Sequence, residues 1–95
     1  KLSADQGNAK AQFNVGNMYL KGEGVRQDYA EAFKWFKLSA DQGNHGAQFN
    51  VGLMYKNGEV VRQDYAEAKE WFGKSCDNGY KIGCARYREL NNLYW

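Results

Sequence analysis

The chain has 95 residues, which is enough for one small domain and too few for two. Its formal net charge is +2, and the 13 basic residues form no block of the kind that binds nucleic acid. No apolar run reaches the about 18 residues that a membrane-spanning helix needs, so we expect no membrane insertion. Proline and threonine are absent and β-branched residues are scarce, which favours an all-α fold.

The sequence repeats itself with a period of 36 residues. Residues 1–36 and 37–72 are identical at 28 of 36 positions, and a partial third copy begins at Gly73. This period is typical of arrays of helix pairs, in which stacked neighbours complete a core that one unit cannot bury alone. We therefore divide the chain, which begins inside a repeat and reads as trimmed, into four segments. These are residues 1–7 (the end of a preceding helix B), repeats at 8–43 and 44–79, and a terminal helix at 80–95.

The first helix of each repeat, helix A, is predicted at about residues 9–20 and 45–56. In the first copy its expected buried stripe consists of Ala11, Val15, Met18 and Tyr19. Gly16 and Gly52 lie inside these helices, where glycine costs about 0.5–1 kcal/mol relative to alanine. We therefore expect a large ring on the paired helix to approach the backbone there. The candidate rings are those of Trp35 and Trp71.

A glycine-bearing turn leads from helix A into the second helix of the repeat, helix B. Helix B is predicted to begin near Asp28 and Asp64, each of which is followed three residues later by a glutamate, the pattern of a capping box. Gly43 and Gly79 stand where left-handed caps are expected to end helix B. The expected buried stripe of the first helix B consists of Ala32, Trp35, Phe36 and Ser39.

The third copy departs from the other two in its helix A. It has Tyr87-Arg88 where the earlier copies have a valine and a glycine, and no second helix follows. An arginine in place of the close-packing glycine would prevent another helix from docking at that position. We therefore interpret residues 81–94 as a terminal capping helix with a solvated outer face.

The order AQFNVGNMY, GEGV, Asp28-Tyr29, Trp35-Phe36 and a closing ADQG resembles the Sel-one-like repeat (SLR), a relative of the tetratricopeptide repeat. Plain tetratricopeptide repeats have about 34 residues and lack the Gly-x-Gly-Val turn, so the period and the turn together favour the SLR. The resemblance covers essentially the whole chain. It implies an all-α, right-handed α/α solenoid that serves as a protein–protein interaction scaffold.

Cys76 and Cys84 stand at the end of helix B and the start of the next helix A, in the places of Ala40 and Gln48. The turn between these antiparallel helices can bring the two α-carbons to the about 5.5 Å that a disulfide needs. The spacing also resembles that of cysteine-rich secreted bacterial SLR proteins, which implies a bridge between the helix ends. The alternative is two free buried thiols, which suits Cys84 less well because glutamine in its place indicates a partly wet site.

A Cys76–Cys84 bridge would indicate an oxidising compartment, so we expect a periplasmic or secreted protein while a cytoplasmic location stays open. Two cysteines without a nearby histidine do not make a zinc site, and we expect neither a metal nor another cofactor.

No set of side chains that would catalyse a reaction is evident, and we expect the protein not to be an enzyme. The single histidine, His45, is expected to be exposed at a helix start, and the serines recur at one scaffold position in every copy. Some cysteine-rich SLR proteins are associated with penicillin binding or β-lactamase activity, which leaves this activity as an alternative. Against it, the chain has no Ser-x-x-Lys motif, and a Lys-Thr-Gly motif is impossible without threonine.

Positions that differ between the copies indicate where packing does not dictate the residue. On helix A, such positions together with one unchanged asparagine form a stripe, which we call the A-helix stripe. We expect the A helices to line the concave side of the solenoid and this stripe to bind a peptide or a protein edge. Its candidate binding residues are Lys10, Asn14, Asn17, Lys21, Asn50, Leu53, Asn57, Arg86 and Glu89.

Two other interpretations of the A-helix stripe stay open: a solvated face that drifts without selection, and a purely structural segment of a longer solenoid. On helix B, Phe33 is replaced by Lys69 in the second copy. Phe33 is therefore expected to be an exposed aromatic residue or a contact with a repeat that the chain lacks.

Overall fold

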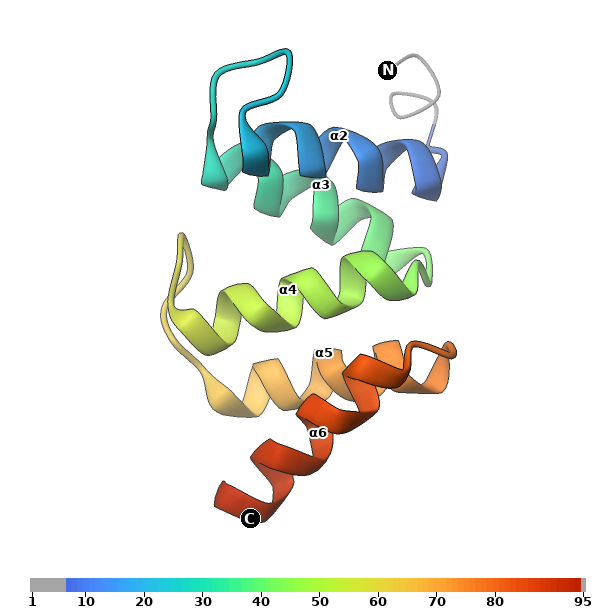
Figure 1. Cartoon of the computed structure of the whole chain (residues 1–95), viewed down its shortest axis with the longest axis vertical. Coiled ribbons are helices and arrows are strands. Elements are labelled where there is room, and N and C mark those ends of the chain that lie inside the picture. The colour runs from blue at the N-terminus through green and yellow to red at the C-terminus, as the bar shows by residue number, and fades with distance from the viewer. Residues whose placement is uncertain (1–6, 95) are drawn as a thin grey trace.

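The computed structural model describes residues 7–94, with side chains as far as Asn92. The predicted end of a preceding helix B therefore lies, apart from Gly7, outside the described residues. Five helices follow one another along the long axis of the molecule (Figure 1). They are α2 (Ala9–Lys21), α3 (Tyr29–Asp41), α4 (His45–Asn57), α5 (Tyr65–Asp77) and α6 (Lys81–Tyr94).

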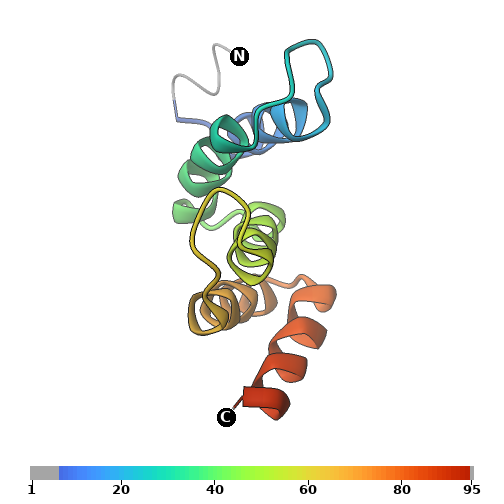
Figure 2. The same ribbon diagram turned by 90° about the vertical axis from the view of Figure 1, so that its left-hand side faces the viewer.

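Each helix packs against the next one in the chain, from α2 on α3 to α5 on α6. Figure 2 shows α2, α4 and α6 on one side of the molecule and α3 and α5 on the other. Residues 7–94 contain no strand. The predicted all-α solenoid of stacked helix pairs is thus confirmed, and none of the described helices combines the length and the apolar character needed to cross a membrane.

The predicted helix ends agree with the structure because their signals are local. Asp28 and Asp64 each accept a hydrogen bond on Oδ1 from the backbone N–H three residues later, at 3.1 and 3.0 Å. These bonds satisfy amides that have no partner inside the helix. After helix B, Gly43 and Gly79 both have a φ of 96°, in the left-handed region that the sequence predicted.

The core forms where the two repeats meet. Phe36 on α3 and Val51 on α4 are fully buried, and Trp71 on α5 belongs to the same buried cluster with 5% of its surface exposed. Of the predicted helix B stripe, Ala32, Phe36 and Ser39 are buried, whereas Trp35 is only half-buried.

Two sequence expectations about apolar side chains are wrong. Met18, predicted to be buried, is 38% exposed, whereas its equivalent Met54 is 3% exposed because Met54 belongs to the core between α3 and α4. No described helix stands before α2 to cover Met18 in the same way. Phe33 is half-buried, and its contact lies within the chain itself. Its ring packs edge-on against Tyr55 of α4, with the centroids 5.9 Å apart.

The glycines inside helix A do allow a ring to approach, but not the ring that we expected. A Cβ atom on Gly16 would lie 2.7 Å from the ring of Phe36, and one on Gly52 would lie 2.8 Å from the ring of Phe72. The tryptophans next to these phenylalanines point toward other neighbours. Because adjacent residues on a helix are rotated by about 100°, the face of helix B that meets helix A carries the phenylalanines.

The last helix, α6, is held near its beginning. A Cβ atom on Gly83 would lie 2.7 Å from Oγ of Ser75, so this glycine permits close contact with α5. Tyr80 precedes α6, and its ring stacks on His45 and meets Phe49 edge-on at centroid distances of 5.2 and 5.1 Å. Arg88, at the place of Gly16 and Gly52, is exposed. In α6 the glycine that permits close contact with helix B is therefore Gly83 in the first turn, and no longer a residue in the middle of the helix.

Candidate interaction surface

The A-helix stripe lies on accessible surface in both full repeats. In the first repeat Lys10, Asn14 and Lys21 are exposed and Asn17 is half-buried. In the second, Asn57 is exposed and the two residues before it on the stripe, Asn50 and Leu53, are half-buried. These seven side chains come from α2 and α4, which lie on the same side of the molecule (Figure 2).

A small notch opens within this surface between the end of α2 and the second half of α4. Its volume is about 80 Å³. Three residues of the stripe border the notch, and apolar side chains from both repeats line it. The lining residues are Leu20, Phe36, Asn50, Leu53, Met54, Asn57 and Glu59. We call this feature the α2–α4 notch.

Two asparagine amides border the α2–α4 notch. Within the part of the chain that the structure describes, Asn50 and Asn57 form no side-chain hydrogen bond. An asparagine amide offers both a donor and an acceptor. Each of the two amides therefore keeps a donor and an acceptor that no described side chain or backbone group uses.

The stripe is different on α6. Arg86 and Glu89 form an ion pair with each other, with Nη1 of the arginine 3.1 Å from Oε1 of the glutamate. Nε of Arg86 is buried and has no hydrogen-bond partner. The structure thus places these two predicted binding residues on one face of α6 but has them engage each other, while the asparagines of α4 keep their amides free.

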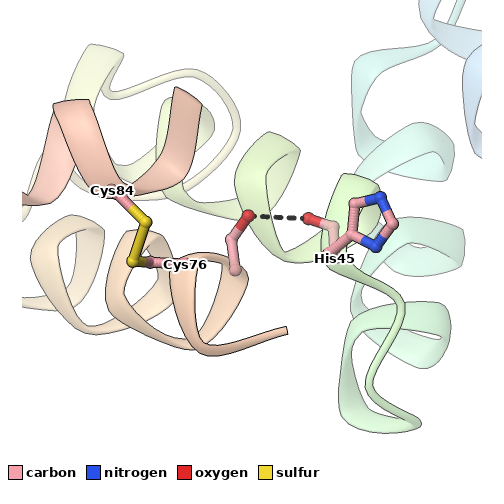
Figure 3. Close-up of a disulfide and its surroundings, with 4 residues drawn as sticks. His45, Cys76 and Cys84 are labelled. Atoms are coloured by element: carbon pink, nitrogen blue, oxygen red, sulfur yellow. Dashed lines mark hydrogen bonds between the residues drawn. A yellow bond between two sulfur atoms is a disulfide. The ribbon is translucent and has the colours of Figure 1, made fainter. Parts of the chain in front are cut away.

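Cys76 and Cys84 form the predicted disulfide, with their α-carbons 4.6 Å apart (Figure 3). At the equivalent joint between α3 and α4, Nε2 of Gln48 donates a hydrogen bond to the backbone oxygen of Ala40 at 3.1 Å. Cys84 is half-buried, in agreement with a partly wet site, whereas Gln48 at the equivalent place is only 4% exposed. The disulfide at the last joint therefore replaces a buried hydrogen bond that holds the first joint.

The described serines have a structural role. Oγ of Ser39 donates a hydrogen bond to the backbone oxygen of Ala9 at 2.6 Å, and Oγ of Ser75 donates one to that of His45 at 3.0 Å (Figure 3). Both serines have no exposed surface, so neither hydroxyl can reach a substrate. His45 is exposed at the first position of α4, as predicted.

Sequence reasoning missed two hydrogen bonds that join an exposed amide after helix B to a buried glutamine of helix A. Nε2 of Gln42 donates to Oε1 of Gln12 at 2.7 Å, and Nδ2 of Asn78 donates to Oε1 of Gln48 at 3.0 Å. The available signal was that Gln12 recurs as Gln48 and that an amide stands at both positions 42 and 78. Among residues 7–94, no three His, Cys, Asp or Glu side chains are grouped so that they could hold a metal ion.

Comparison with known proteins agrees with this architecture. The sequence profile of the Sel1 repeat family matches residues 9–44 and 45–80. Among solved structures, a protective antigen of uropathogenic Escherichia coli with an SLR fold is 42% identical, with a TM-score of 0.82 over 85% of this chain. A Sel1 repeat protein from Oxalobacter formigenes is 33% identical, with a TM-score of 0.86 over 90% of this chain.

The chain spans 17% of the length of the first of these proteins and 35% of the second. Among curated protein sequences, no relative matches it. Sel1 repeats are helical repeats that generally mediate protein–protein interactions, and proteins built from them are typically non-enzymatic scaffolds. Two matched repeats, which cover most of the sequence, establish that the chain belongs to the Sel1 repeat family.

Proposed function

We propose that the chain is a scaffold segment that holds a peptide or protein edge on the A-helix stripe of α2 and α4. The observation that carries this proposal is the α2–α4 notch, an apolar opening bordered by the hydrogen-bonding side chains of Asn50 and Asn57. Peptide-binding grooves combine pockets for side chains with polar groups for the backbone.

The size of the notch limits what it can take. An apolar cavity of about 150 Å³ holds a benzene-sized group, so a notch of about 80 Å³ suits a smaller one. The partner is therefore an extended segment with a small aliphatic side chain, such as alanine or valine, at the point where it crosses Leu53. Asn14 and Asn17 on α2 extend the polar surface along the same path.

The experiment selects peptides on the pure, oxidised protein and measures their affinity by titration. Peptides from a randomised library are enriched on the wild type and then tested against the double variant Asn17→Arg, Asn50→Arg. Two bulky cations on the stripe should weaken binding at least about tenfold, because a buried ion without a partner costs more than one hydrogen bond contributes. The matched control is Lys34→Ala on α3, on the opposite side of the molecule.

If the selected peptides bind the wild type and the double variant with equal affinity, the groove hypothesis is wrong and the segment is purely structural. A selection that enriches no peptide would have the same meaning. Loss of peptide binding by the control variant would indicate that the site lies on the B helices and not on the A helices. Circular dichroism of each variant separates loss of binding from loss of fold.

We further propose an oxidising location for the protein, in a bacterial periplasm or outside the cell. The Cys76–Cys84 bridge supports this proposal, because disulfides persist in such compartments and are rare in the cytosol. Trapping thiols with an alkylating agent in intact cells tests it. Quantitative alkylation of both cysteines before any reduction would contradict it.

A further inference from the structure

A depression on the described surface lies at the last joint of the stack, away from the A-helix stripe. Its volume is about 340 Å³, and it is lined by residues of α5 and by one tyrosine of α6. We call it the α5–α6 pocket. Its lining residues are Glu70, Gly73, Lys74, Cys76, Asp77 and Tyr87.

The repeat shows what occupies the equivalent place one unit earlier. Shifting Gly73, Cys76 and Tyr87 back by 36 residues gives Lys37, Ala40 and Val51. Ala40 and Val51 belong to the buried cluster that contains Trp71, and Nζ of Lys37 lies 5.4 Å from the centre of the Trp71 ring. The equivalent position at the first joint is therefore filled by an aromatic ring with an ammonium group over it.

At the last joint Gly73 stands in the place of Lys37, so that ammonium group is absent, and no described residue takes the place of the Trp71 ring. In the first copy Nζ of Lys37 also pairs with Asp41, at 3.6 Å. With Gly73 in place of Lys37, the equivalent carboxylate of Asp77 forms no ion pair within the described residues.

Two other charges border the pocket. Glu70 likewise has no ion pair in the described part of the chain, whereas Lys74 directs its ammonium group at the Trp71 ring, 4.2 Å from its centre. Lys69 lies over the outer wall, with Nζ 5.4 Å from the centre of the Tyr87 ring. Two carboxylates thus stay at the rim without a cation of their own.

From these contacts we infer that the α5–α6 pocket binds an aromatic side chain of a partner protein that carries an adjacent lysine or arginine. The ring takes the place that Trp71 takes at the first joint, between Cys76 and Tyr87. The basic group takes the place of the Lys37 ammonium group and pairs with Asp77. A volume of about 340 Å³ exceeds the about 150 Å³ that a benzene-sized group needs, so an indole fits.

The inference is independent of the proposed groove, because no residue of the A-helix stripe lines this pocket. Arg88 also explains why the occupant is a side chain and not a further helix pair. A helix B in the regular position needs glycine where α6 has arginine, since Gly16 and Gly52 are there to admit a phenylalanine ring.

The test uses the whole chain, labelled with ¹⁵N and with its disulfide intact, and the tripeptide acetyl-Lys-Trp-Lys-amide as probe. We expect amide signals of Gly73, Cys76 and Asp77 to shift in a saturable way on titration. Acetyl-Lys-Ala-Lys-amide, which has no ring, and acetyl-Glu-Trp-Glu-amide, which has the opposite charge, should each bind at least about fivefold more weakly, the range that about 1 kcal/mol represents.

Matched variants locate the site. Asp77→Asn should weaken binding of the probe about threefold, as expected for one exposed ion pair, and Asp41→Asn should leave it unchanged because Asp41 is already paired with Lys37. Gly73→Leu should abolish binding by filling the pocket. If this variant does not fold, the affinities of Asp77→Asn and Asp41→Asn for the probe still test the inference.

Equal effects of Asp77→Asn and Asp41→Asn would overturn the inference, and so would equal binding of the two basic tripeptides. Shifts of the same amides on concentrating the protein without a probe would mean that a second copy of the chain occupies the pocket. The double variant Asn17→Arg, Asn50→Arg should bind the tripeptide probe like the wild type. The inference about the α5–α6 pocket would therefore stand even if the groove hypothesis proved wrong.

Discussion

Val60 has a backbone conformation that side chains of its type rarely adopt. Its φ is 67°, close to the 74° of Gly24 at the equivalent position of the first repeat. A β-branched residue in the left-handed region is strained by about 1–3 kcal/mol. With 52% of its surface exposed, Val60 gains little from burial in return.

The substitution Val60→Gly should therefore stabilise the protein. Part of the relieved strain is offset by the greater freedom of glycine in the unfolded chain, so we expect about 1 kcal/mol more free energy of unfolding. Urea denaturation measures it. The matched control is Gly24→Val, whose Cβ atom would meet only Cε of Met18 at an ordinary 3.7 Å and which should destabilise through its φ. An unchanged urea midpoint for both variants would contradict the claim that the backbone of Val60 is strained.

Two glycines inside helices should respond to alanine in opposite directions. Gly52→Ala places a Cβ atom 2.8 Å from the buried ring of Phe72, and such overpacking costs about 1–3 kcal/mol. Gly73→Ala meets the ring of Tyr87 at 3.2 Å, but this ring is 36% exposed and can move. The second variant should gain up to about 1 kcal/mol of helix propensity. Thermal unfolding of both variants checks the signs, and destabilisation by Gly73→Ala would show that Tyr87 is fixed.

At the scale of the helix, the joints of the stack use two different bonds at one position. Ala40 and Gln48 form a hydrogen bond between α3 and α4, whereas Cys76 and Cys84 form a covalent bond between α5 and α6. Helix α6 packs on α5, and the disulfide joins the end of α5 to the first turn of α6.

The double variant Cys76→Ala, Cys84→Gln recreates the first joint at the second. Removing the bridge should cost about 2–3 kcal/mol through the greater freedom of the unfolded chain. The new hydrogen bond should return about 1 kcal/mol relative to Cys76→Ala, Cys84→Ala. Guanidinium unfolding of the oxidised wild type and of both double variants measures the order of their free energies of unfolding. Equal stability of the two double variants would mean that the new glutamine amide does not bond to the backbone oxygen at position 76.

The helices were predicted closely from the sequence, and their contacts only in part. Helix B begins where Asp28 and Asp64 place its cap, because capping depends on residues three positions apart. The ring that meets Gly16 could not be assigned in this way, since Trp35 and Phe36 are neighbours in the chain and only the packing angle of α3 on α2 decides between them.

The candidate site was predictable to a similar extent. The A-helix stripe could be located because the copies differ there, yet the α2–α4 notch combines Leu20 with Leu53, residues from two repeats, and no spacing in the sequence specifies their distance. The α5–α6 pocket had no sequence signal of its own. It becomes visible only when Gly73 is compared with Lys37 in three dimensions.

For the whole molecule, cohesion between repeats depends on Trp71 more than on its equivalent. Trp71 on α5 is buried in the cluster shared with α3 and α4, whereas Trp35 is half-buried and its Nε1 donates to Glu31 of its own helix at 3.3 Å. Trp71→Ala should therefore cost about 3–5 kcal/mol of stability.

Trp35→Ala should cost clearly less, because a half-buried ring loses less contact. Urea unfolding of the two variants, followed by circular dichroism, compares the same substitution at equivalent positions. Equal losses would mean that each repeat is stabilised from within and that the joint contributes little. A larger loss for Trp71→Ala would support the view that stability in such arrays depends on nearest-neighbour interfaces.

The bridge at the last joint also changes how the protein responds to tension. When a solenoid is pulled from its ends, terminal helices peel away one after another and each releases its full chain length. Cys76 and Cys84 are 8 positions apart in the sequence. The bridge withholds about 28 Å of extension at 3.3–3.6 Å per residue. A load applied beyond α6 can therefore unwind this helix only as far as Cys84, after which the bridge passes the load into α5 while the turn between the two helices stays closed.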